Sequence, residues 1–223
     1  GVERPALAAL VPKEKNPVVV LDAGANVDCR PYHLFQFGLM GDAFARDLLS
    51  YAAPRVSLLS IGEEEGKGNC QVKEAYELLK MAQNINFIGN AEGRDIFTGD
   101  IDVVICDGFV GNVVLKLTEG LGSWFSKELK GILFQNAASK IGAVFLSKGV
   151  LSFKKKMDYT EYGGAPLMGI SKPVIKAHGS SNAKAFKNAI RQAKEYTERG
   201  VIGEISGALA QLRANAADNR TEG

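Results

Sequence analysis

PVVVLDAGAN, from Pro17 to Asn26, is a β-branched apolar run that stops at a loop of glycine and asparagine. The same pattern recurs in four further stretches: Val56–Asn69, Ile85–Asn90, Val103–Asn112 and Pro173–Asn182. An apolar run that ends in this way and is followed by a helical pattern predicts a strand of an α/β sheet. Because ligands of open α/β sheets bind beyond the carboxyl ends of the strands, we expect these loops to gather around one site. Glycine lets backbone N–H groups approach an anion and asparagine offers both a donor and an acceptor, so the loops predict an anion site.

Strands and helices alternate along most of the chain, which predicts right-handed crossovers and a mostly parallel sheet covered on both faces. We therefore expect a three-layer α/β/α fold, in which residues 1–223 form a single α/β domain. The expected strands are Pro17–Asp22, Arg55–Ile61, Asn86–Ile88, Ile101–Cys106 and Pro173–His178. The expected helices are Pro31–Ser50, Asn69–Gln83, a short one starting near Glu92, Asn182–Arg199 and Gly203–Asn215.

Residues 113–157 interrupt this alternation and read as helical throughout, which predicts a protruding helical hairpin inserted into the domain. An apolar segment flanked by lysines lies at its middle and contains Ile141, Val144, Phe145 and Leu146. We expect this segment to form the tip of the hairpin and to contact a membrane surface, with the lysines at the headgroups. A dimer interface or a buried helix would give the same pattern, and the residues alone leave these alternatives open.

The composition excludes several other classes of protein. A net charge of +2 over 223 residues does not favour nucleic acid as a partner. The three cysteines (Cys29, Cys70 and Cys106) lie far apart without histidines at metal-ligand spacing, so we expect no metal and a reducing, cytoplasmic setting. No apolar run approaches the length of a transmembrane helix. Lysines are dense between Lys154 and Lys194, which suits an acidic partner or an anionic membrane, or simply a solvated helix face.

The loop GEEEGKGN, residues 62–69, has the glycines and the lysine of a phosphate loop but not their spacing. A Walker sequence needs four residues between its glycines and a serine or threonine after the lysine, so we do not expect ATP binding. Lys67 could instead neutralise a single phosphate or polarise a carbonyl group, and an ion pair with a neighbouring glutamate is the alternative. The chain also has neither a GxSxG nucleophile elbow nor a GxGxxG dinucleotide motif.

Two further loops offer groups that suit an oxyanion. In DGFVGN, the amide of Asn112 stands near the start of a long helix, where it could cap the helix or donate to an oxyanion. In HGSSN, the side chain of His178 precedes two serines and the N-terminus of another helix, which together suit an anion. His178 could bind phosphate or carry a proton, and the alternative is a structural hydrogen bond to a neighbouring loop.

These stretches resemble the bacterial phosphate acyltransferases of phospholipid synthesis. The matching segments run in the family's order from about Arg4 to Arg191 and read VLDAGANVDCRP, IGEEEGKGN, NFIGNAEGRDIF, DVVICDGFVGNVVLK, MDYTEYGGAPLMG and HGSSNAKAFKNAI. The resemblance implies a fold related to phosphotransacetylases and isopropylmalate-type dehydrogenases. It implies the conversion of acyl-acyl-carrier protein and inorganic phosphate to acyl phosphate and free carrier protein, without a cofactor. It also implies a cytoplasmic homodimer at the membrane surface, where a glycerol-3-phosphate acyltransferase takes the product.

The resemblance and the chemistry of the loops together predict a site. Phosphate is itself the nucleophile, so no catalytic serine or cysteine is needed. We expect catalytic roles for Lys67, Asn112 and His178. Phosphate and substrate contacts are expected from Asn26, Gly66, Gly68, Asn69, Gly111, Gly179, Ser180, Ser181 and Asn182.

Two other functions stay open at this point. One is a non-catalytic, membrane-associated adaptor of lipid synthesis, and the other is a phosphotransacetylase that uses acyl-coenzyme A. Family members also carry an amino-terminal segment ahead of the matching region, and we expect that this chain lacks it.

Overall fold

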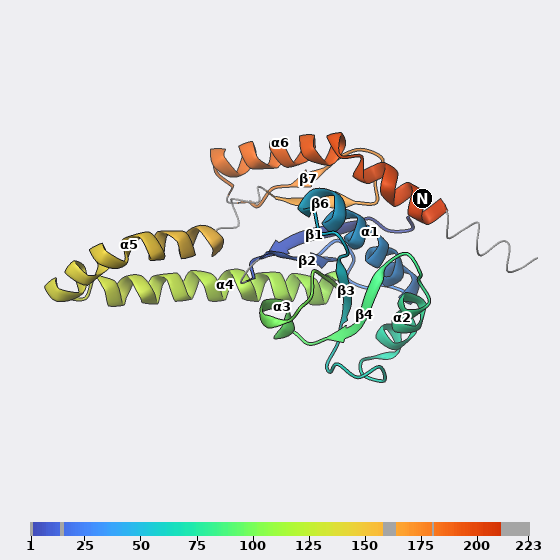
Figure 1. Cartoon of the computed structure of the whole chain (residues 1–223), viewed down its shortest axis with the longest axis horizontal. Coiled ribbons are helices and arrows are strands. Elements are labelled where there is room, and N and C mark those ends of the chain that lie inside the picture. The colour runs from blue at the N-terminus through green and yellow to red at the C-terminus, as the bar shows by residue number, and fades with distance from the viewer. Residues whose placement is uncertain (1, 14–15, 158–163, 180, 211–223) are drawn as a thin grey trace, which may run out of the picture.

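The structure is a computed structural model that describes residues 2–13, 16–157, 164–179 and 181–210 (Figure 1). Its centre is a seven-stranded sheet with the strand order β4-β3-β5-β2-β1-β6-β7. The strands are β1 (Ala6–Val11), β2 (Val18–Leu21), β3 (Arg55–Leu59), β4 (Asn86–Ala91), β5 (Val103–Ile105), β6 (Ala165–Met168) and β7 (Ile175–Lys176). Ser180 and the predicted helical residues 211–215 lie outside the described residues.

The sheet has a parallel half and an antiparallel half. The strands β2, β3, β4 and β5 all pair in parallel, whereas β1 is antiparallel to both β2 and β6, and β6 is antiparallel to β7. It follows that β6 points the same way as β2, and that only β1 and β7 run in the opposite direction. The prediction of a mostly parallel sheet is therefore confirmed.

Three features of the antiparallel half differ from the sequence-based expectation. The strands β1 and β6 were not predicted, because ALAALV and APLM are short, rich in small residues and not followed by a glycine–asparagine loop. The fifth predicted strand exists only as β7, which pairs antiparallel with β6 at the edge of the sheet. Its exit loop, containing His178, thus leaves the sheet at the end opposite to the loops after β2, β3, β4 and β5, and the expectation that all five loops gather at one edge was wrong.

Helices cover both faces of the sheet (Figure 1). Pro31 opens α1 (Pro31–Leu49), as its fixed φ predicts for a first helical position, and α1 packs with α2 (Cys70–Lys80) on one face. On the opposite face lie α3 (Asp95–Thr98) and the first turns of α4 (Gly108–Leu133). The helix α6 (Ala183–Glu198) lies beside β7 and is followed by helical residues 201–210. The three-layer arrangement of the α/β fold is confirmed.

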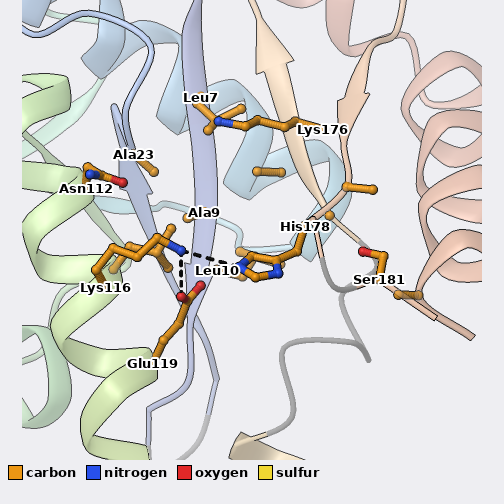
Figure 2. A pocket seen from close by; sticks show the side chains of 15 residues that line it. Leu7, Ala9, Leu10, Ala23, Asn112, Lys116, Glu119, Lys176, His178 and Ser181 are labelled. Carbon is orange, nitrogen blue, oxygen red and sulfur yellow. Dashed lines mark hydrogen bonds and ion pairs between the residues drawn. The ribbon is translucent and has the colours of Figure 1, made fainter.

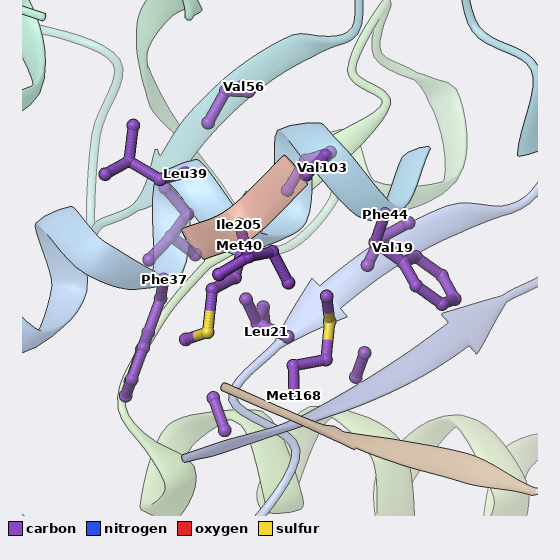
Figure 3. Packing of buried hydrophobic residues seen from close by; sticks show 14 of the residues in the cluster. Val19, Leu21, Phe37, Leu39, Met40, Phe44, Val56, Val103, Met168 and Ile205 are labelled. Atoms are coloured by element: carbon purple, nitrogen blue, oxygen red, sulfur yellow. The ribbon is translucent and has the colours of Figure 1, made fainter. Parts of the chain in front are cut away.

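The core explains why the central strand reads as a continuous apolar run. All of β2 (VVVL) is fully buried, since Val19 and Leu21 face α1 while Val18 and Val20 face the opposite helical layer. Figure 3 shows Leu21 of β2 close to Met40 of α1 and Met168 of β6. Burial of each such side chain contributes roughly 1.5–3 kcal/mol to the stability of the fold. The four buried side chains of β2 therefore stabilise the centre of the sheet.

The predicted hairpin is formed by α4 and α5 (Ala137–Met157), which extend together away from the sheet (Figure 1). The chain reverses at residues 134–136, so Ile141 to Leu146 form the second and third turns of α5 rather than the tip. The reason is that Asn136 accepts a hydrogen bond from the amide of Ser139 and starts α5 earlier than the apolar run suggests. None of the helices in the described part of the chain combines the length and apolar character needed to cross a membrane.

Candidate functional site

Asp22 organises the loop that follows β2. Its carboxylate is fully buried and accepts hydrogen bonds from the backbone N–H groups of Leu7, Gly24, Ala25 and Asn26 at 2.8–3.0 Å. The amide nitrogen of the Asn26 side chain donates to Asp22 at 2.8 Å and to the carbonyl of Pro5 at 2.7 Å. Both N–H groups of that amide are thus used within the protein, which gives Asn26 a structural role in the loop; its predicted substrate contact stays a prediction.

The start of α4 packs directly on this loop. Asp107 caps the helix by accepting a hydrogen bond from the Val110 N–H at 2.8 Å. A Cβ atom on Gly108 would lie 2.6 Å from the carbonyl oxygen of Asn26, and one on Gly111 would lie 1.9 Å from the carbonyl oxygen of Asp22. The glycine spacing of DGFVGN is therefore required by close contact between helix and loop backbones.

Asn112 is exposed on the second turn of α4 and does not cap the helix, because Asp107 does. A Cβ atom on Gly24 would lie 3.3 Å from the Asn112 Cβ, so the loop after β2 backs the asparagine side chain. Asn112 and Ala23 both line a cavity of about 130 Å³. The amide is therefore available at the wall of a pocket.

This pocket lies between α4, β1 and the segment that joins β7 to α6 (Figure 2). Most of its wall is apolar and comes from Leu7, Ala9, Leu10, Ala23, Leu115, Gly164, Ala165, Ala177 and Ala185. Its polar side chains are those of Asn112, Lys116, Glu119, Lys176, His178 and Ser181. Of the residues predicted from sequence, the pocket brings together Asn112, His178 and Ser181.

The polar groups of the pocket form a cluster that bridges α4 and the β7–α6 segment. The ammonium of Lys116 lies 2.7 Å from the Glu119 carboxylate and 3.4 Å from Nε2 of His178 (Figure 2). The hydroxyl oxygen of Ser181 is buried and has no hydrogen-bond partner among the residues that the structure describes. A cation, an imidazole and an unsatisfied hydroxyl group at one apolar cavity are suited to a small oxyanion.

The N-terminus of α6 borders the same cavity. Asn182 caps α6 by accepting from the Ala185 N–H at 3.0 Å, and the His178 carbonyl accepts from the Ser181 N–H at 3.0 Å. The positive end of the helix dipole adds to the attraction for an anion there. The side-chain oxygen of Asn182 is engaged in the cap, so its predicted phosphate contact would come from its side-chain amide nitrogen or its backbone N–H.

The loop with Lys67 does not contribute to this pocket. Lys67 is exposed, and within residues 2–210 as described it makes no ion pair, since Glu65 pairs with Lys80 at 2.7 Å. Asn69 caps α2 through the Val72 N–H at 2.9 Å. The alternative role of Lys67 as a partner of a neighbouring glutamate is thus not observed, and its catalytic role stays a prediction.

The structure gives a reason for some of the predicted glycines and none for others. Gly68 has a φ of +104°, a conformation that favours glycine, and a side chain there would also meet Val72. At Gly66 and Gly179, a Cβ atom would meet no atom of the described residues within 4 Å, so steric contact with that part of the chain does not explain these two glycines.

Sequence reasoning did not single out Lys116 and Glu119. They follow Asn112 at positions i+4 and i+7 and therefore share its helix face. The shared helix face could have been found from the sequence, but its role becomes clear only when the structure shows that this face of α4 lines a cavity.

Two of the cysteines are held in their neutral form. Burial, followed by the nearby carboxylates of Asp22 and Asp107, raises the pKa of the Cys29 thiol to about 12. Burial also raises the pKa of the Cys106 thiol. Thiols with such pKa values are poor nucleophiles at neutral pH. Within the described residues, no cluster of histidine, cysteine and carboxylate side chains could hold a metal ion.

The fold and the pocket define an α/β protein with a mixed sheet and a cavity that joins an oxyanion-suited cluster to an apolar wall. The model of the fatty acid synthesis protein family matches residues 1–204, and the chain belongs to this family. It is 61% identical over 199 residues to a phosphate acyltransferase of Nitratidesulfovibrio vulgaris, covering 89% of this chain and 58% of that protein. It is 62% identical over 200 residues to a phosphate acyltransferase of Lawsonia intracellularis, again covering 89% and 58%.

The chain is also similar to a less closely related phosphate acyltransferase and to two solved structures. The phosphate acyltransferase of Clostridium perfringens is 50% identical over 206 residues, covering 92% of this chain and 61% of that protein. The chain thus spans about three fifths of the length of these relatives. Among solved structures, a phosphotransacetylase from Streptococcus pyogenes aligns with a TM-score of 0.56 at 17% identity, covering 89% of this chain and 55% of that one. A branched-chain phosphotransacylase from Enterococcus faecalis gives 0.53 at 16% identity, covering 86% and 66%. At these identities the likeness confirms the phosphotransacetylase-like fold alone.

Proposed function

We propose that the full-length protein makes acyl phosphate from inorganic phosphate and an acyl thioester of acyl carrier protein, as a step of phospholipid synthesis. The relatives named phosphate acyltransferase support this, since they share 50–62% of aligned residues with the chain. The single observation that carries the proposal is the cavity that joins polar side chains, among them Asn112 and His178, to a mostly apolar wall. Such a cavity suits a substrate with a polar reacting end and an aliphatic chain.

The reaction follows from the chemistry of that cavity. Phosphate, held by His178, Ser181 and the N-terminus of α6, attacks the thioester carbonyl with one oxygen. The new carbon–oxygen bond produces a tetrahedral oxyanion, to which the amide of Asn112 donates. Lys67 does not line this pocket, and its role as an oxyanion donor is a separate prediction that the Lys67→Ala variant tests. The carbon–sulfur bond then breaks, and the proton of the attacking hydrogen phosphate passes through His178 to the departing thiolate. The products are acyl phosphate and the free carrier thiol.

Positioning and oxyanion stabilisation carry the proposed rate enhancement. Holding phosphate next to the thioester is worth ~7–11 kcal/mol in favourable cases. One oxyanion donor contributes about 3–4 kcal/mol. No residue of the chain has to form a covalent bond to the acyl group, because phosphate is the nucleophile.

Incubation of the full-length protein with radiolabelled phosphate and acyl-acyl-carrier protein tests the proposal. We expect labelled acyl phosphate from the carrier-bound substrate, and at least tenfold lower turnover in Asn112→Ala, His178→Ala and Lys67→Ala, a loss of ~1.4 kcal/mol each. Near-normal turnover in any one variant would remove that residue from the mechanism. Product from acyl-coenzyme A alone would favour a phosphotransacetylase, and the absence of product from either donor would favour a non-catalytic adaptor.

We also propose that the protein is a cytoplasmic homodimer at the membrane surface, where a glycerol-3-phosphate acyltransferase takes its product. The helical hairpin supports this, since large apolar side chains along α4 and α5 are exposed and include Leu117, Leu121, Trp124, Ile132 and Phe145. Exposed apolar surface on this scale is typical of protein or membrane contact. Sedimentation equilibrium of the full-length protein tests the dimer, and a monomer at micromolar concentration would contradict it.

The membrane contact is proposed for Ile141, Val144, Phe145 and Leu146, whose exposed fractions are 58–83%. Replacing Val144 with aspartate should weaken binding to anionic phospholipid vesicles about tenfold, because a charge would have to enter the acyl region. Vesicle co-sedimentation measures this, and turnover without vesicles should not change. Met81→Asp is the matched control, since Met81 is 69% exposed on the body of the protein, against 71% for Val144. Equal vesicle binding by the two variants would contradict the proposed contact.

A further inference from the structure

Lys116 is the charged residue of the pocket that contacts polar groups from two different elements. Its ammonium lies between Glu119, one turn further along α4, and His178, which follows β7. The distances are 2.7 Å to the carboxylate and 3.4 Å to the imidazole Nε2. An ammonium group has three N–H donors, so contact with one carboxylate leaves capacity for an additional oxygen ligand.

The second lysine of the pocket is less well placed. Lys176 lies on β7, and its side chain extends across β1 beside Leu7, away from the imidazole (Figure 2). Lys116, in contrast, lies with His178 at the polar side of the cavity, where the Ser181 hydroxyl is buried without a partner in the described part of the chain. An oxyanion beside Lys116 and His178 would receive donors from α4 and from the β7–α6 segment at once, whereas Ser181 lies on the far side of the imidazole (Figure 2).

We propose that Lys116 is the cation that binds the phosphate substrate in this pocket, and that Glu119 is its positioning residue. This inference rests on the proposed function and adds to it two residues to which the sequence analysis assigned no role. A lysine side chain has many rotamers in water, and ordering one has an entropic cost. The carboxylate of Glu119 restricts the ammonium to the pocket before phosphate arrives, since it lies 2.7 Å away and its side chain is only 26% exposed.

Glu119 has a second consequence for the site. Its negative charge opposes phosphate, but we expect the ordering of the Lys116 ammonium to be the larger of the two effects. Loss of the carboxylate alone should therefore act on the affinity for phosphate, through a less ordered lysine, rather than on the chemical step. A positioning role predicts that KM for phosphate changes while kcat does not. A general structural role predicts that both constants change.

The test uses the full-length protein and inorganic phosphate as the probe. Equilibrium dialysis with radiolabelled phosphate gives its Kd, and steady-state kinetics gives KM for phosphate and for the acyl donor. Lys116→Met, which keeps the apolar stem, and Lys116→Ala should each raise the Kd and KM for phosphate at least tenfold and change KM for the donor less than twofold. Lys116→Arg should stay within about threefold of the wild type, because it restores the charge.

The Glu119 variants and a matched lysine complete the experiment. Glu119→Gln should raise KM for phosphate severalfold with kcat within twofold, and Glu119→Asp should restore part of the loss. Lys73→Ala is the control, since Lys73 is an exposed lysine of α2 outside the pocket and should leave every constant unchanged. Circular dichroism confirms that each variant is folded.

The outcomes separate this inference from the proposed function. Wild-type phosphate affinity in folded Lys116→Met would overturn the role of Lys116, even if the enzyme still makes acyl phosphate. Phosphate binding that depends on Lys116 in a protein that makes no acyl phosphate would overturn the proposed reaction and leave the phosphate site in place. A Glu119→Gln variant that loses kcat and KM for both substrates together would overturn the positioning role of Glu119.

Discussion

Replacing Gly111 with alanine is expected to lower the free energy of unfolding by about 3 kcal/mol or more, which is large against the ~5–15 kcal/mol that stabilise a domain. The added Cβ atom would lie 1.9 Å from the carbonyl oxygen of Asp22 and 2.9 Å from the sulfur of Cys106. The first of these is a backbone atom at the end of β2, which cannot rotate away as a flexible side chain could. The helix α4 would have to move off the loop that forms one wall of the pocket.

Thermal and urea unfolding followed by circular dichroism measure this effect. Gly120→Ala is the matched control, because it lies on the same helix and a Cβ atom there would meet nothing within 4 Å. At that position alanine should stabilise the helix by about 0.5–1 kcal/mol. Equal stability of the two alanine variants would show that α4 does not approach β2 as closely as the structure has it.

Replacing Asp22 with alanine is expected to cost about 4 kcal/mol of unfolding free energy, since a hydrogen bond to a charged group contributes ~1.5–3 kcal/mol. The carboxylate is fully buried and accepts from four backbone N–H groups and from the side-chain amide of Asn26. The variant would leave these donors without a partner, and those at the loop surface could turn to water. The expected loss of unfolding free energy is therefore smaller than the sum of five separate hydrogen bonds.

The same variant should also weaken the site. Ala23 lines the pocket and Gly24 packs against Asn112, so a loosened loop would release the wall behind the proposed oxyanion donor. Chemical unfolding and acyl phosphate formation in the full-length protein measure both effects. Asp28→Ala is the control, because Asp28 is exposed in the same connection and its loss should change stability by less than ~0.5 kcal/mol. If Asp22→Ala and Asp28→Ala have the same free energy of unfolding, the hydrogen bonds to the Asp22 carboxylate contribute little to stability.

Much of the fold could be predicted from the sequence because its signals are local. Pro31 at a first helical position, the buried run VVVL and the cap residue Asn182 each act within one or two turns of chain, and each produced the predicted element. The strands β1 and β6 could not be found in this way, because their short runs of small residues carry no strong strand signal and β6 pairs with β1, which lies far away in the sequence. These short runs become strands because β1 pairs along the edge of β2 and β6 pairs in turn along the edge of β1.

The candidate site shows the same division between local signals in the sequence and contacts that only the fold creates. The sequence identified Asn112, His178 and Ser181 as polar groups at helix starts, and the structure places all three at one cavity. It could not reveal that Gly111 serves close packing against Asp22, or that Lys116 and Glu119 face His178. Those relations depend on how α4 crosses the sheet.

By itself, then, the sequence determined the α/β class, the helical hairpin and the chemistry of the glycine–asparagine loops, because apolar periodicity and turn residues act over short distances. The tertiary structure decided which of those loops meet. An antiparallel β7 sends the His178 loop to the end of the sheet opposite to the other four loops, and α4 spans the sheet so that Asn112 and Lys116 still reach the same cavity as His178. Strand direction and helix crossing are set by contacts between residues far apart in the chain, and these leave no periodic signal in the sequence.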